Sequence, residues 1–72
     1  MKVKASDGKT YDVATAAPGK EHAVTLGGAD VGAFVLEPNE TRVTRAAGGS
    51  TKLLLDIAER FVDQGGAPMG ML

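Results

Sequence analysis

The spacing of apolar residues changes once along the chain, and this change constrains the fold most. In MKVKASDGKTYDV, apolar side chains alternate with polar ones on both sides of Ser6-Asp7-Gly8, which is the pattern of a β-hairpin. From Ser50 the spacing becomes that of a helix, predicted over residues 51–64 and ending before Gly65. Strand-like spacing followed by a single helical segment favours an α+β fold.

The loop of the first hairpin can be chosen from the side chains that it brings together. A two-residue loop at Asp7-Gly8 would place Val3 opposite Asp12 and mix apolar and charged groups on one face. A three-residue loop with Gly8 in the left-handed conformation keeps the apolar residues together. The predicted pairs are Val3 with Tyr11 and Met1 with Val13.

A second hairpin is predicted around Gly27-Gly28, with a loop of two or four residues. Either loop length would put two sets of alternating side chains on one face, namely His22, Val24 and Leu26 with Val31, Ala33 and Val35. Phe34 and Leu36 would then lie on the opposite face, so the second strand is predicted to be buried on both sides and central.

The chain then turns at Pro38, and residues 41–44 are rich enough in β-branched side chains to form a return strand. Whether Val43 lies opposite Phe34 or Val35 stays open. The whole pattern predicts an antiparallel meander of four to five short strands, which could curl toward a small barrel, followed by one C-terminal α-helix. One domain is expected over residues 1–66, with strands in 1–46 and an apolar tail at 67–72.

Composition excludes several classes of protein. A chain of 72 residues has a thin core, and without cysteine it has neither disulfides nor a thiolate zinc site. A net charge of −1 indicates neither a basic nucleic-acid groove nor an acidic nucleic-acid mimic. No stretch resembles a membrane span or a signal peptide, so a cytoplasmic location is expected, with no cofactor and no metal.

The GGSTK stretch has two interpretations. Gly48, Gly49, Ser50, Thr51 and Lys52 could bind an anion through backbone N–H groups and a positive helix end. The spacing is not that of a Walker loop, however. We favour a hinge at the two glycines and a helix cap from Ser50 or Thr51.

Catalytic residues are not apparent. His22 is the only histidine, and it is predicted to be an exposed or strand-end residue with apolar neighbours. A general base needs a nucleophile or an orienting carboxylate within reach, and the sequence pattern supplies neither. We therefore do not expect an enzyme.

Charged residues of the helix and last strand are interpreted as ordinary surface charge. Asp56, Glu59 and Asp63 form one stripe that could offer oxygen ligands or contact a basic partner, and Asp56 is spaced to pair with Arg60. Arg42 and Arg45, with Lys52, form a candidate basic patch, but no aromatic residues are interleaved for base stacking.

The helix has more apolar surface than one sheet face requires. At about 100° per residue its apolar residues fill an arc of roughly 200°, which leaves Leu55 and Val62 on the flank. The tail adds Met69, Met71 and Leu72. The tail could cover this flank, or the flank and tail could contact a second chain.

The function expected from these patterns is a small, non-catalytic protein–protein interaction module. It would bind a partner protein, with a homodimer as a further option, through the helix flank and the C-terminal tail. One alternative is a phosphate or nucleic-acid binder that uses GGSTK. Another is a regulator or inhibitor, encoded by a mobile element or operon, that occludes a larger partner.

Overall fold

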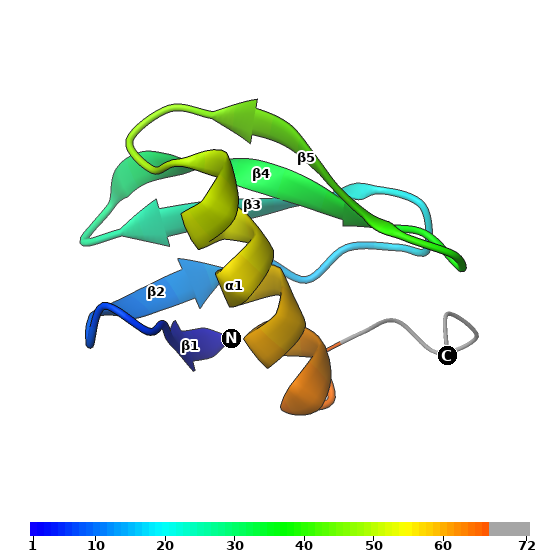
Figure 1. Cartoon of the computed structure of the whole chain (residues 1–72), viewed down its shortest axis with the longest axis horizontal. Coiled ribbons are helices and arrows are strands. Elements are labelled where there is room, and N and C mark those ends of the chain that lie inside the picture. The colour runs from blue at the N-terminus through cyan, green and yellow to red at the C-terminus, as the bar shows by residue number, and fades with distance from the viewer. Residues whose placement is uncertain (67–72) are drawn as a thin grey trace.

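The computed structural model describes residues 1–66 as an antiparallel sheet with one helix across one of its faces (Figure 1). The elements are β1 (Lys2–Lys4), β2 (Thr10–Val13), β3 (Glu21–Leu26), β4 (Ala29–Leu36), β5 (Thr41–Ala46) and α1 (Thr51–Asp63). Strand order in the sheet follows the chain from β1 to β5, with every neighbouring pair antiparallel. The predicted α+β meander is confirmed with five strands, and the sheet stays open instead of closing into a barrel.

The first hairpin has the predicted three-residue loop. Val3 pairs with Tyr11, and Gly8 has a φ of 84°, which is the left-handed conformation that glycine adopts without strain. At the open end of the hairpin, the backbones of Met1 and Val13 exchange two hydrogen bonds of 2.8 Å. The register therefore collects the apolar side chains of β1 and β2 on one face.

The second hairpin has a two-residue turn, but its face assignment differs from the prediction. Leu26 pairs with Ala29 across the glycine turn, and a β-bulge between Val24 and Thr25 then shifts the register, so that His22 lies opposite Phe34. One extra residue on a strand reverses the face of every side chain beyond it. Phe34 therefore shares the face of His22, whereas Ala33 and Val35 lie on the outer face, and the predicted grouping of these residues was wrong.

β4 lies inside the sheet and is paired on both sides, with all residues from Val31 to Leu36 buried. Burial on both faces was predicted. The register left open after Pro38 is also settled, because Val43 pairs with Phe34.

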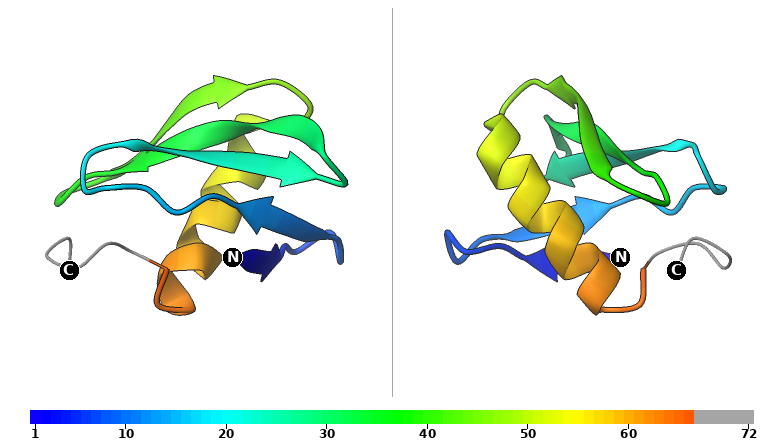
Figure 2. Two further views of the ribbon diagram at one scale, coloured as in Figure 1. Left: turned by 180° about the vertical axis from the view of Figure 1, so that it is seen from behind. Right: turned by 45° about the vertical axis from the view of Figure 1, so that its right-hand side comes forward.

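The core lies between the sheet and α1. The helix contributes Leu54, Ile57, Ala58 and Phe61, all 0% exposed. The sheet contributes Val3, Tyr11, Val13, Val24, Phe34 and Leu36. The view from behind in Figure 2 shows that no element of the described chain covers the other face of the sheet.

α1 begins and ends as predicted. Ser50 is the N-cap, and its Oγ accepts a hydrogen bond from the backbone N–H of Leu53 at 3.1 Å. At the other end Gly65 has a φ of 81°, the left-handed conformation typical of the residue after a helix. Within residues 1–66 no helix has the length and apolar character that crossing a membrane requires.

Candidate functional site

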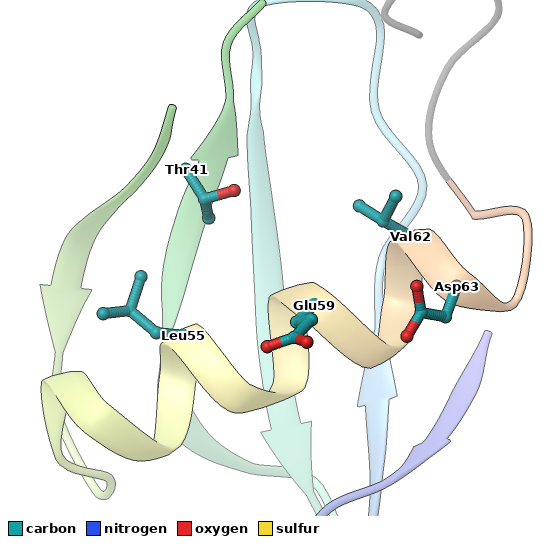
Figure 3. A pocket seen from close by; sticks show the side chains of 5 residues that line it. All are labelled: Thr41, Leu55, Glu59, Val62 and Asp63. Atoms are coloured by element: carbon teal, nitrogen blue, oxygen red, sulfur yellow. The ribbon is translucent and has the colours of Figure 1, made fainter. Parts of the chain in front are cut away.

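A hollow lies between the exposed flank of α1 and the beginning of β5 (Figure 3). Its volume is about 370 Å³. The residues that line it are Thr41 from β5 and Leu55, Glu59, Val62 and Asp63 from α1. We call it the α1–β5 hollow. It contains both helix-flank residues, Leu55 and Val62, that the sequence singles out as surplus apolar surface.

The hollow exists because α1 crosses the sheet obliquely. Its first turn lies beside β5, whereas its last turn lies beside β1, so the helix and the beginning of β5 diverge (Figures 1 and 2). Leu55, Glu59 and Val62 are four and three residues apart, which places them in one row along the helix. In Figure 3 this row lies across from Thr41.

Polar contacts hold the helix on the β1 side of the sheet. A carboxylate oxygen of Asp56 accepts a hydrogen bond from the backbone N–H of Ser6 at 3.0 Å, and Gln64 Nε2 donates to the carbonyl oxygen of Lys2 at 3.1 Å. On the β5 side, two apolar residues of the helix, Leu55 and Val62, and two acidic residues line the hollow. These two hydrogen bonds therefore attach α1 to the sheet on its β1 side, and the hollow lies on its other side.

The predicted stripe of acidic residues is divided by these contacts. Asp56 forms the predicted pair with Arg60 at 3.1 Å, and its pKa is lowered first by the hydrogen bond from Ser6 and then by Arg60. Glu59 and Asp63 instead face the hollow, where they form neither an ion pair nor a side-chain hydrogen bond with any residue of 1–66. Among the described residues no three potential ligands are grouped to hold a metal ion.

At the start of α1, the GGSTK stretch acts as the predicted cap and hinge. The backbone N–H groups of Gly48 and Gly49 both donate to the carbonyl oxygen of Val31, at 3.1 Å each. A Cβ added to Gly49 would lie 2.7 Å from Val31 Cγ1, so the hinge passes close to β4. Anion binding by Gly48–Lys52 stays a prediction, and the N–H groups of Gly48 and Gly49 could contribute to it only by leaving Val31.

His22 is near the end of a strand, as predicted, but it is buried. It is 1% exposed, and its ring lies 5.2 Å from the ring of Phe34 and 5.0 Å from that of Phe61, measured between centroids. Its Nδ1 donates to the carbonyl oxygen of Ala14 at 2.9 Å. The bulge in the second hairpin explains why His22 is buried, because it places Phe34 on the same face of the sheet as His22.

The two arginines of the candidate basic patch each pair with carboxylates on the sheet. Arg42 contacts Glu37 at 2.7 Å, and Arg45 pairs with Asp30 and lies 4.0 Å from Glu21. Their charge is thereby balanced locally. Met69, Met71 and Leu72, which the sequence analysis adds to the interaction surface, lie outside the described residues.

Sequence reasoning missed Thr41 as a residue of the site. Nothing in the local sequence distinguishes Thr41 from Thr44, because its position depends on where β5 lies relative to the helix. Comparison with models of protein families, with curated proteins and with solved structures finds no match to this chain. The geometry of the hollow is therefore the basis on which a function can be inferred.

Proposed function

We propose that this protein is a non-catalytic interaction module that binds a partner protein through the α1–β5 hollow. The observation that carries the proposal is the exposure of Leu55, which is 41% exposed in a concave site although its neighbour Leu54 is completely buried. Exposed apolar surface within a depression is typical of binding sites. A volume of about 370 Å³, near the lower limit of the roughly 300–1,000 Å³ found for small-ligand pockets, leaves room for a few side chains of a partner.

The interactions of the titratable groups favour binding over catalysis. His22 is enclosed by two phenylalanine rings and donates its Nδ1 proton to a backbone carbonyl oxygen. Asp7 accepts hydrogen bonds from Tyr11 and Lys9, and Asp56 accepts from Ser6 and Arg60. These contacts stabilise a turn or join two elements, except the bond between Arg60 and Asp56, which lies within α1. A regulator that occludes a larger partner would be one form of the same binding function.

Selection from a library of random peptides displayed on phage tests this proposal with the full chain as bait. We expect peptides whose affinity falls at least about tenfold for Leu55→Asp, since a charge would replace the exposed apolar contact. Thr10→Asp is the matched control, because it adds the same charge to the outer face of the sheet. Circular dichroism establishes that both variants are folded.

Two results would overturn the proposal. In one, the selected peptides bind the full chain, Leu55→Asp and Thr10→Asp with equal affinity, which places the contact elsewhere. In the other, the library yields no peptide that binds the full chain.

A further inference from the structure

The charge of the α1–β5 hollow restricts which partner segment can bind there. An inference about that segment rests on the binding function proposed above. Two of its five lining residues, Glu59 and Asp63, are acidic and none is basic. They are four residues apart, so two like charges lie on neighbouring turns, a spacing that destabilises a helix. Both are also in the last two turns of α1, where the helix dipole adds further negative potential.

Within residues 1–66, every carboxylate outside the hollow except that of Glu40 has a hydrogen-bond or ion-pair partner. The other helix carboxylate, Asp56, pairs with Arg60, and on the sheet Asp12, Glu37 and Asp30 each pair with a lysine or an arginine. A cation bound between Glu59 and Asp63 would remove their mutual repulsion. Side chains at this spacing are about 5–6 Å apart at Cβ, so one ammonium or guanidinium group can contact both.

The apolar part of the hollow lies beside this acidic pair. Leu55 and Val62 are seven residues apart along α1, which corresponds to about 10 Å, and Glu59 lies between them. An occupant must therefore bring an apolar side chain to Leu55 and Val62 and a positive charge to the adjacent carboxylates. On the opposite wall Thr41 offers a hydroxyl group.

Two alternative occupants fit this chemistry poorly. A second copy of the chain, docked through the same surface, would bring four carboxylates together. The chain's own residues 67–72 have the sequence APMGML, which contains no lysine or arginine. We propose that the α1–β5 hollow binds a short segment of a partner protein in which a large apolar side chain adjoins a lysine or arginine.

Titration of synthetic six-residue peptides into isotopically labelled full-length chain tests the proposal by NMR. One peptide alternates leucine with lysine, the second leucine with glutamate, and the third leucine with serine. We expect the lysine peptide to shift the methyl signals of Leu55 and Val62 and to bind about tenfold more tightly than the serine peptide, because two exposed charge pairs are added. Added salt should reduce this advantage.

Variants of the carboxylates separate a specific contact from general attraction. Glu59→Gln combined with Asp63→Asn should remove the preference for lysine. The matched control, Glu21→Gln combined with Asp30→Asn, removes two carboxylates from the outer face and should preserve it. Both double variants change the net charge equally.

The outcomes distinguish this inference from the proposed function. If all three peptides bind at Leu55 and Val62 with equal affinity, the charge selectivity is wrong and the binding function stands. If sedimentation shows a dimer that Leu55→Asp dissociates, the occupant is a second copy and the inference is wrong. If no peptide moves these methyl signals, the inference is also wrong, and the phage selection then decides on the binding function.

Discussion

Tyr11 and Asp7 form the most informative side-chain contact of the first hairpin. The Tyr11 hydroxyl donates to Asp7 at 2.6 Å, and the other carboxylate oxygen of Asp7 accepts the backbone N–H of Lys9 at 2.9 Å. The hydrogen bond to Asp7, together with burial, raises the pKa of Tyr11 to about 12, while the same bond lowers the pKa of Asp7. The sequence predicts the loop but not this contact, because the spacing of apolar residues does not show where the hydroxyl group of Tyr11 lies.

The titration of Tyr11 can be followed without interference, because the chain has one tyrosine and no tryptophan. We expect the ultraviolet absorbance of the phenolate to appear with a midpoint near pH 12 in the folded chain. The folded pKa lies above the ordinary value of 10.0, so this contact stabilises the fold fully below pH 10, and its contribution is lost as pH rises toward 12.

Asp7→Asn should move that midpoint down toward 10, because the negative charge beside the hydroxyl disappears. Asp12→Asn is the control, since Asp12 pairs with Lys2 on the outer face and should leave the titration unchanged. A midpoint near 10 in the unaltered folded chain would show that Tyr11 does not donate to Asp7.

Among the elements, the contact between α1 and β4 depends on Gly32. Its φ is 152°, which few residues other than glycine adopt. A Cβ at this position would lie 2.3 Å from the carbonyl oxygen of Arg45 and 2.6 Å from Leu54 Cδ1. The helix can approach β4 closely because this side chain is absent.

Gly32→Ala should destabilise the fold by about 3 kcal/mol, which combines backbone strain with overpacking. Gly19→Ala is the matched control, because Gly19 also has a positive φ of 78° but no atom within 4 Å of an added Cβ. Urea unfolding of both variants gives the comparison. Equal losses of stability would mean that strain alone matters and that α1 does not pack tightly at this point.

The helix and the first hairpin were predicted correctly, whereas the register of the second hairpin was not, and this difference has a physical cause. The helix and first hairpin follow from local signals, namely a serine cap and glycines where φ is positive. The bulge at Val24 and Thr25 was missed because the apolar residues of both strands alternate, and the one local signal, Gly32 inside β4 opposite Val24, does not by itself fix the register. The single extra residue of this bulge reversed the predicted face of Phe34, whose ring stacks on the ring of His22.

For the whole molecule, the sequence singled out four of the five residues that line the candidate site, but not their grouping with Thr41. The helical spacing alone singled out Leu55 and Val62, because an apolar arc wider than one sheet face leaves residues on the flank. The position of Thr41 across from them depends on the oblique path of α1 across the sheet. This path is fixed by contacts between residues far apart in the chain, such as Ser6 with Asp56 and Lys2 with Gln64. Local spacing contains no information about such contacts.

Three consecutive leucines in α1 differ in burial, so substitutions can distinguish a leucine that stabilises the core from one that belongs to the candidate site. Leu53 is half-buried, Leu54 is completely buried, and Leu55 is 41% exposed. Leu54→Ala should cost about 2–5 kcal/mol, since it leaves a cavity against β4, whereas Leu55→Ala should change stability by about 0.5 kcal/mol or less. Thermal and urea unfolding measure both values.

The difference between these two variants decides whether the hollow is a surface that folding does not require. A small loss for Leu55→Ala, together with reduced peptide binding, would mean that this leucine contributes to binding and not to the core. A loss for Leu55→Ala as large as that for Leu54→Ala would mean that the flank is covered within the folded chain. The α1–β5 hollow would then be part of the core and closed to a partner.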